Sequence, residues 1–213
     1  MNAILAADHI QKKYGGKPVL HDASIHVKQG EIYGLIGKNG SGKTTLLRIL
    51  TGLIPTYSGT VSVGDVNRQK ARISAVIHSP SLFFHLTAFE NLKEDCPHKL
   101  VKHFSLGMTQ RLKLAVALLA KPDILILDEP VNGLDPEGIA DLRELLLRLN
   151  KTSDMTILIS SHILSELEQI ATCFGILHEG KVVKELSQME LSQSEYKLEE
   201  LYMLYTRGGK SGA

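Results

Sequence analysis

The feature that most constrains this chain is the run GKNGSGKT at Gly37–Thr44. It matches the pattern G-x-x-x-x-G-K-[ST] at every fixed position. A short apolar strand is predicted just before it, at Ile32–Ile36, and apolar residues at helical spacing predict a helix over Lys43–Leu50. Glycine lets the backbone take unusual conformations and come close to a phosphate group. The run therefore predicts a phosphate-binding loop between a strand and a helix.

Each polar group of this loop has a task in binding a nucleotide. The backbone N–H groups from Asn39 to Thr44, with the start of the helix, would surround the β- and γ-phosphates. Lys43 would bring positive charge to the phosphate oxygens, and the Thr44 hydroxyl would ligate Mg²⁺. The candidate nucleotide-binding residues of the loop are Gly37, Asn39, Gly40, Ser41, Gly42, Lys43, Thr44 and Thr45. The alternative is a chance glycine-rich turn, expected in on the order of one chain in a hundred.

A second candidate site lies in the run ILILDE at Ile124–Glu129. Four aliphatic residues in a row suit a strand buried on both faces of a parallel sheet. The two carboxylates would then lie at the carboxyl edge of that sheet, where open α/β folds bind ligands. There Asp128 would hold Mg²⁺, and Glu129 would orient or deprotonate an attacking water. A strand that ends in a solvated Asp-Glu turn is the alternative, and the upstream phosphate loop makes it the weaker one.

The order of predicted elements indicates an α/β fold. The first third is mostly strands, and the second half alternates helix and strand, which favours a parallel sheet with helices on both faces. The strands are expected at His21–Val27, Glu31–Ile36, Gly59–Asp65, Ile73–Ile77, Ile124–Leu127, Thr156–Ser160 and Cys173–Leu177. Beyond Lys43–Leu50, helices are expected at Ser105–Ala120, Pro136–Asn150 and His162–Ala171.

Composition excludes several classes of protein. The chain has 213 residues, which suits one domain with at most a small appendage. Lys and Arg number 24 against 23 Asp and Glu, so no basic footprint for nucleic acid or an anionic membrane is present. Cys96 and Cys173 lie far apart, which fits a reducing compartment better than a disulfide scaffold. No apolar run approaches the roughly 18 residues of a membrane span, so a membrane role would need a separate partner chain.

The motifs together resemble the ATP-binding subunit of an ABC transporter, over nearly the whole chain. The phosphate loop resembles the Walker A motif of that family, and ILILDE its Walker B motif. FSLGMTQR at Phe104–Arg111 resembles the signature, and Gly133–Asp135 the D-loop. His162 has the position of the switch histidine, and Tyr14 that of the aromatic residue that stacks on adenine. The resemblance implies a P-loop NTPase core, with a mostly parallel sheet flanked by helices and an N-terminal antiparallel β-subdomain.

The resemblance also implies roles for individual residues. Glu129 and His162 would be catalytic, ATP the substrate, and Mg²⁺ the metal held by Thr44 and Asp128. Ser105, Gly107 and Asp135 would complete the site of a second ATPase subunit in a head-to-tail homodimer or pair. Simpler interpretations stay open for these residues. Ser105 and Asp135 are good helix caps, a histidine often begins a helix, and a tyrosine near a Gly-Gly turn often only packs.

Two departures from the family pattern point to a subfamily. The signature has Leu106 and Met108 where the family has Gly and Gln, and this SLGM form resembles the ATPases of peptide-antibiotic exporters, such as bacitracin and lantibiotic self-protection systems. His78 stands at the Q-loop position, where the family has Gln. A histidine there could reach Mg²⁺ or the water with a charge that depends on pH, or be a plain loop residue.

The largest departure is a gap around residues 92–104. After Leu92 the family carries several dozen helical residues before the signature, whereas here only Lys93–His103 intervene. We therefore expect a reduced helical subdomain within an ATPase domain at residues 1–186. Residues 187–213 are expected to form an amphipathic helical extension, with Leu198, Leu201, Tyr202 and Tyr205 on one stripe, and a frayed tail.

The sequence favours one function and leaves an alternative. It predicts an ATPase subunit that energises export, with an antimicrobial peptide as the cargo that the resemblance implies. A separate transmembrane permease would hold this subunit at the inner, cytoplasmic face of the cell membrane. The alternative is a nucleotide-binding module that hydrolyses ATP poorly and powers no transport, because its helical arm is reduced. A role on nucleic acid or ribosomes is disfavoured by the single domain and the net charge of +1.

Overall fold

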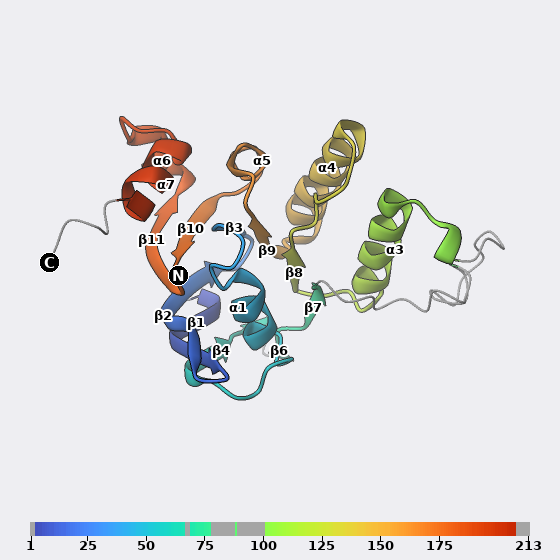
Figure 1. Cartoon of the computed structure of the whole chain (residues 1–213). Coiled ribbons are helices and arrows are strands. Elements are labelled where there is room, and N and C mark those ends of the chain that lie inside the picture. The colour runs from blue at the N-terminus through green and yellow to red at the C-terminus, as the bar shows by residue number, and fades with distance from the viewer. Residues whose placement is uncertain (1–2, 67–68, 78–87, 89–100, 208–213) are drawn as a thin grey trace, which may run out of the picture.

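The computed structural model describes residues 3–66, 69–77, 88 and 101–207. Within these residues one nine-stranded sheet runs through the molecule in the order β4-β1-β2-β11-β10-β3-β9-β8-β7 (Figure 1). A separate two-stranded hairpin is formed by β5 (Asp65–Val66) and β6 (Gln69–Lys70). The large sheet has a parallel part and an antiparallel part, which together position the candidate site.

The parallel part consists of the five strands from β10 to β7. In sheet order they are β10 (Cys173–His178), β3 (Ile32–Ile36), β9 (Thr156–Ser161), β8 (Ile124–Asp128) and β7 (Ile73–Val76). Every residue of β3, β8 and β9 is buried, which explains their nearly unbroken apolar sequences. Because these strands are parallel, the phosphate loop after β3 and the acidic pair after β8 meet at the same edge of the sheet.

The antiparallel part contains the first two strands of the chain and an edge strand. β1 (Ala3–Tyr14) pairs with both β2 (Lys17–Lys28) and β4 (Ser58–Val63). β11 (Lys181–Ser187) joins the two parts, because it is antiparallel to β10 and parallel to β2. The predicted fold class, a P-loop NTPase core with an N-terminal antiparallel β-subdomain, is confirmed.

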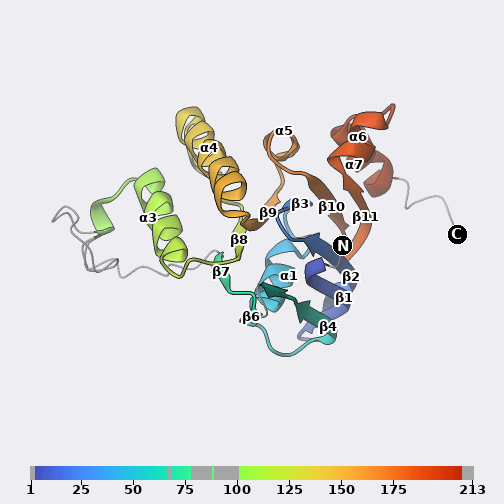
Figure 2. The same ribbon diagram turned by 180° about the vertical axis from the view of Figure 1, so that it is seen from behind.

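Helices cover both faces of the sheet. α1 (Lys43–Leu50) lies on one face, whereas α7 (Leu198–Arg207), α5 (Leu164–Glu168), α4 (Pro136–Ser153) and α3 (Leu106–Leu119) follow one another along the other side (Figures 1 and 2). The side chains of β8 alternate accordingly. Ile124 and Ile126 belong to the core cluster that includes α1, and Leu125 and Leu127 to the cluster that includes α4 and α7.

The C-terminal extension packs on the sheet rather than away from it. α6 (Gln188–Gln193) begins with a capping box between Ser187 and Glu190. In α7, Leu198, Leu201 and Tyr202 are buried in the same cluster as the sheet. The division of the chain at residues 186 and 187 stays a prediction.

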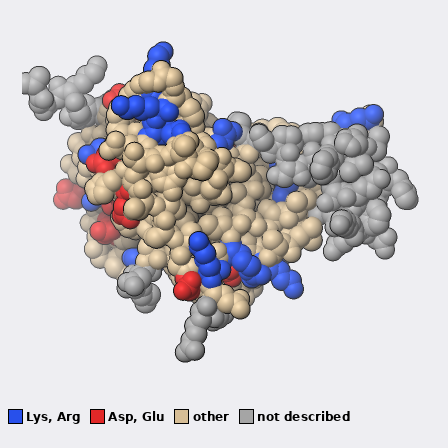
Figure 3. Space-filling view, turned by 90° about the horizontal axis from the view of Figure 1, so that it is seen from below, with Lys and Arg blue, Asp and Glu red and all other residues tan. Residues whose placement is uncertain are grey.

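Six α-helices occur in the part of the chain that the structure describes. Much of the interval 92–104 lies outside the described residues, and its last part is the short 3₁₀ helix Val101–His103, which precedes α3. No helix within the described ranges is long and apolar enough to cross a membrane. On the face drawn in Figure 3, basic and acidic side chains both occur.

Candidate nucleotide-binding and hydrolysis site

The phosphate loop is held in shape by glycines with little room around them. Gly42, the residue before α1, has φ +108°, and a Cβ atom there would lie 2.7 Å from Leu20 Cδ2. At Gly37 an added Cβ would lie 2.5 Å from Ser41 Oγ and 2.6 Å from the Leu177 carbonyl oxygen. The loop is thus packed between β2 and the end of β10, and side chains at these two positions would force it open.

The side chain of Ser41 places a hydroxyl oxygen, Oγ, inside this loop. Its side chain is buried, and among the described residues its Oγ has no hydrogen-bond partner. Buried hydroxyls are normally satisfied, and an exception calls for an explanation. A phosphate oxygen accepted into the loop would supply the partner. This observation fits the predicted use of the loop.

Lys43 bends over the loop and reaches the acidic pair. Its Nζ donates to the carbonyl oxygen of Gly37 at 2.6 Å and of Lys38 at 3.3 Å. The same Nζ lies 3.0 Å from Glu129 Oε1, an ion pair without the alignment of a hydrogen bond. The lysine and glutamate side chains are only 6% and 7% exposed. Lys43 therefore links the phosphate loop with the carboxylate at the end of β8.

Asp128 and Thr44 form the predicted oxygen pair for a metal ion. The Thr44 hydroxyl donates to Asp128 Oδ2 at 2.7 Å, and the buried Ser160 hydroxyl donates to Asp128 Oδ1 at 2.6 Å. A hydroxyl and a carboxylate are hard oxygen ligands, which suit Mg²⁺ when phosphates and waters complete its octahedron. The residues present therefore fit a magnesium ion beside the phosphate loop.

Glu129 stands between a lysine and a histidine. Its Oε2 lies 2.8 Å from His162 Nδ1, and 40% of the His162 side chain is exposed. The Glu129 backbone has φ +50° and is followed by Pro130, an unusual conformation for a residue before proline. Its N–H donates to the Ser160 carbonyl oxygen at 3.1 Å and to Ser160 Oγ at 3.0 Å. Strained residues of this kind cluster at functional sites.

The remaining candidates for nucleotide binding lie around this centre. Asn39 and Gly40 are exposed at the turn of the loop, and Thr45 is half-buried in the first turn of α1. Tyr14 ends β1 and is 46% exposed, with Lys12 Nζ 5.2 Å from the centre of its ring. His78 lies outside the described residues.

The signature residues lie apart from the phosphate loop of the same chain. Ser105 caps α3 by accepting a hydrogen bond from the Met108 N–H at 3.2 Å, and its side chain is exposed. α3 stands at the end of the sheet opposite α7, separated from α1 in both views (Figures 1 and 2). Asp135 caps α4, accepting from the Gly138 N–H at 2.9 Å. The predicted capping roles of Ser105 and Asp135 are confirmed.

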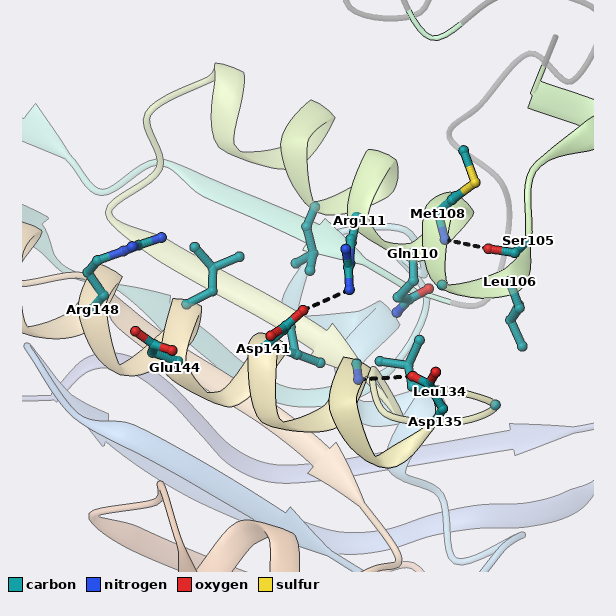
Figure 4. Close-up of a pocket in the computed structure, with 16 residues that line it drawn as sticks. Ser105, Leu106, Met108, Gln110, Arg111, Leu134, Asp135, Asp141, Glu144 and Arg148 are labelled. Atoms are coloured by element: carbon teal, nitrogen blue, oxygen red, sulfur yellow. Dashed lines mark hydrogen bonds and ion pairs between the residues drawn. The ribbon is translucent and has the colours of Figure 1, made fainter. Parts of the chain in front are cut away.

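A groove of about 610 Å³ separates α3 from α4 (Figure 4). At its end Leu106 covers Gly133, where an added Cβ would lie 2.1 Å from Leu106 Cδ2. Further along, Gln110 Nε2 donates to the Pro130 carbonyl oxygen at 3.2 Å. Leu106, which stands where the family has glycine, thus has room for its side chain because Gly133 has none.

Sequence reasoning missed one residue of this site, Ser160. Its hydroxyl contacts Asp128 and the N–H of Glu129, as described above. In the sheet Ser160 is the direct neighbour of Asp128, because β8 and β9 run parallel. The signal available in the sequence was a hydroxyl residue at the end of an apolar strand. Only the pairing of β8 with β9 shows that this hydroxyl lies beside Asp128.

Comparison with known proteins identifies the family. The family model described as "ABC transporter" matches residues 20–132. A second model, described as "AAA domain, putative AbiEii toxin, Type IV TA system", matches residues 100–168. The chain belongs to the ABC transporter family of ATP-binding proteins. It is an ATPase of that family, and the predicted family is confirmed.

Several curated relatives align over most of the chain. It is 41% identical to the uncharacterized ABC transporter ATP-binding protein YcbN of Bacillus subtilis, over 90% of this chain and 72% of the relative. Identity to the bacitracin transport ATP-binding protein BcrA of Bacillus licheniformis is 42%, over 87% and 70%. Identity to the lantibiotic transport ATP-binding protein SrtF of Streptococcus pyogenes is 38%, over 93% and 96%.

The SrtF alignment also reveals a difference in length. It extends over 224 positions, more than the whole of this chain, although it covers only 93% of the chain's 213 residues. The relative therefore has residues without a counterpart here. This chain is therefore shorter than the relative over the aligned region.

Solved structures share the fold. A structure described as the ATP binding subunit of an ABC transporter superposes with a TM-score of 0.82 at 27% identity, covering 95% of this chain and 99% of the other. A dimeric post-hydrolysis state of the ATP-binding cassette MJ0796, bound to ADP and Pi, superposes with a TM-score of 0.75 at 22% identity. This match covers 86% of this chain and 98% of the other. At that identity the second match supports the fold alone.

Proposed function

We propose that this chain binds and hydrolyses Mg-ATP to energise the export of a peptide antibiotic through a separate membrane subunit. One observation carries the hydrolytic part of the proposal. Lys43, Thr44, Asp128, Glu129 and His162 converge at one edge of the sheet, from the ends of β3, β8 and β9. This set supplies a ligand for phosphate, two oxygen ligands for a metal ion and an acid–base pair, all within contact distance of one another.

Binding of ATP would use the loop and change the partner of Lys43. The amides of the loop and the Ser41 hydroxyl would accommodate phosphate oxygens. Phosphates would also compete with Glu129 for the Lys43 ammonium group, which now lies 3.0 Å from the carboxylate. Thr44 and Asp128 would hold Mg²⁺, which when bound neutralises phosphate charge. Tyr14 would stack on the base.

Hydrolysis would then proceed by in-line attack of water on the γ-phosphorus. The oxygen of water forms a bond to phosphorus as the bond to the bridging oxygen of ADP breaks. Glu129 Oε1, released from Lys43, would accept the proton that the water loses. His162 holds the other carboxylate oxygen, Oε2, at 2.8 Å and so would fix the direction of the base. Inorganic phosphate and ADP are the products.

A second subunit would complete each site. Ser105 is exposed and Gly107 half-buried at the start of α3, and α3 stands away from α1, the helix that follows the phosphate loop (Figure 1). The positive end of a helix attracts a γ-phosphate. A head-to-tail dimer would bring Ser105, Gly107 and Asp135 of one chain to the nucleotide of the other. The MJ0796 cassette, which shares this fold, is described as dimeric, and the head-to-tail arrangement of this chain is part of the proposal.

The names of two relatives support the proposed cargo. BcrA and SrtF are named for transport of bacitracin and a lantibiotic, respectively. We therefore infer a peptide antibiotic as cargo. A separate permease would anchor this subunit at the inner face of the cell membrane, with His78 at the Q-loop position of the ATPase. A binding module without useful hydrolysis is the second candidate, favoured by the shorter chain compared with SrtF.

The dimer is tested with Glu129→Gln, which keeps the shape of the site but removes the base. Sedimentation velocity is expected to show a dimer of this variant with Mg-ATP and a monomer with Mg-ADP. The added variant Ser105→Arg, which blocks the signature, should remain monomeric with Mg-ATP. A Glu129→Gln protein that binds ATP but stays monomeric would contradict the head-to-tail site.

Export is tested in a bacitracin-sensitive host that expresses the chain together with a candidate membrane subunit. The wild type should raise resistance, whereas Glu129→Gln should not. Equal resistance with both proteins would exclude ATP-driven export as the function. Phosphate release by the purified chain separates the ATPase from the binding module.

A further inference from the structure

We propose that Ser160 is a positioning residue that sets the direction of both acidic side chains of the site with one hydroxyl group. The inference rests on the proposed function, since it concerns how Asp128 and Glu129 are aimed at Mg-ATP. Ser160 lies at the end of β9 and is completely buried, so it touches neither solvent nor substrate. Any effect on the reaction must therefore pass through its neighbours.

The first neighbour is Asp128. Ser160 Oγ donates to Asp128 Oδ1 at 2.6 Å, while Asp128 Oδ2 accepts from Thr44 at 2.7 Å. The two carboxylate oxygens are thus assigned to different partners. One is anchored within the sheet, and the other faces the hydroxyl that would share the metal. Without the anchor the carboxylate could rotate and lose this division.

The second neighbour is Glu129. The same Oγ accepts from the Glu129 N–H at 3.0 Å, and the Ser160 carbonyl oxygen accepts from it at 3.1 Å. Glu129 has φ +50° at this point and precedes a proline. Such a backbone persists only where its surroundings over-determine it. Ser160 supplies that constraint from the adjacent strand.

A hydroxyl suits this position because it donates and accepts at once. Its proton goes to the carboxylate of Asp128, and its lone pair receives the amide of the next residue. The neighbouring Ser161 has a different task, since its Oγ accepts from the Ile163 N–H at 3.0 Å. The positioning role therefore belongs to Ser160 rather than to serine residues at this edge in general.

The test compares Ser160→Ala with Ser160→Thr, which keeps the hydroxyl. The readout is the affinity for a non-hydrolysable fluorescent ATP analogue, with excess Mg²⁺ and with EDTA. We expect Ser160→Ala to weaken binding about tenfold with Mg²⁺ and to leave binding in EDTA unchanged. Ser160→Thr should keep the gain from Mg²⁺, which is the increase in affinity for the analogue when Mg²⁺ replaces EDTA. Ser160→Ala retains the backbone bond from Glu129 to the Ser160 carbonyl oxygen, so it should remain folded.

Thr156→Val is the matched control. Thr156 is also fully buried on β9, and its hydroxyl accepts from the Gly30 N–H at 3.0 Å, but it lies at the opposite end of the strand. This variant should melt at a lower temperature yet keep the wild-type gain from Mg²⁺. A loss of that gain in Thr156→Val as well would show a merely structural effect and overturn the inference.

The outcomes separate the inference from the proposed function. A folded Ser160→Ala protein with the wild-type gain from Mg²⁺ would overturn the positioning role. If Ser160→Ala does not fold, Ser160→Val takes its place, because valine has no hydroxyl and nearly the shape of the threonine in Ser160→Thr, and an unchanged gain in affinity from Mg²⁺ there has the same meaning. Failure of the wild type to bind the analogue would instead overturn the proposed function.

Discussion

Lys43 and Glu129 form a buried ion pair, with Nζ 3.0 Å from Oε1 and neither side chain more than 7% exposed. The pair joins the phosphate loop to the end of β8, and His162 contacts the other oxygen of the carboxylate. A buried charge is costly unless it is compensated. Within the ion pair, each group therefore compensates the buried charge of the other.

Removal of Lys43 should destabilise the protein measured without nucleotide. Lys43→Ala leaves the Glu129 carboxylate buried without its cation, and the expected loss in the free energy of unfolding is about 3–5 kcal/mol. Urea denaturation measures it. Lys38→Ala is the control, because the Lys38 side chain is exposed in the same loop. Equal stability of the two variants would contradict the energetic role of the pair.

Gly133→Ala should disturb the contact between the D-loop and the signature. Gly133 has φ +76°, which costs about 1–3 kcal/mol for a residue with a side chain, and the new Cβ would force Leu106 to rotate away. Leu106→Ala alone should change stability by less than about 0.5 kcal/mol, because Leu106 is 54% exposed. The double variant should recover the steric part of the loss. Guanidinium denaturation measures all three, and a Gly133→Ala protein as stable as the wild type would refute the close contact.

His26 should make stability depend on pH. A hydrogen bond to Glu185, and a second to Asp8, raise the pKa of His26 above its usual value of about 6.5, although burial acts in the opposite direction. A raised pKa stabilises the folded protein below about pH 6.5, and the contribution is lost as the pH rises through the higher pKa of the folded state.

The midpoint of urea denaturation, followed from pH 6 to pH 8, tests this dependence. The urea midpoint of the wild type should exceed that of His26→Gln by a margin that shrinks as the pH rises. The groups that face His26 are the carboxylates of Asp8 on β1 and Glu185 on β11, and Tyr33 donates to the latter at 2.7 Å. An advantage that grows with pH would mean that the histidine is bound in its neutral form.

Variants of Tyr14 distinguish stacking on adenine from packing within the protein. If its ring stacks on adenine, Tyr14→Ala should weaken ATP binding by about 1–3 kcal/mol, whereas Tyr14→Phe should keep the affinity. Isothermal titration of Glu129→Gln, with the Tyr14 variants added, measures this without turnover. An unchanged affinity in Tyr14→Ala would leave the tyrosine as a packing residue at the end of β1.

Local patterns predicted the centre of the fold well. Lys43–Leu50 is the helix that its leucine spacing predicts, and the aliphatic run at Ile124–Leu127 lies in a buried parallel strand. Both signals are contained in a few consecutive residues. The placement of the acidic pair at the carboxyl edge of the sheet was predicted from the rule for open α/β folds, whereas the contact of Lys43 with Glu129 is a finding of the structure.

Non-local pairing explains what was missed. β1 was not predicted, because register shifts against β2 interrupt its alternation of buried and exposed residues. The helix predicted over His162–Ala171 is only Leu164–Glu168, since Ser161 and His162 belong to the strand end and the site. Ser160 gained its contacts from a neighbouring strand more than 30 positions earlier in the chain.

The central claim is that Glu129 activates water for ATP hydrolysis. Its most direct test is steady-state phosphate release from Mg-ATP by the wild type and by Glu129→Gln, with equal nucleotide binding verified for both. Loss of a general base predicts a rate at least about 100-fold lower in the variant. A wild-type protein that binds ATP but releases phosphate no faster than Glu129→Gln would contradict the account and leave a nucleotide-binding module.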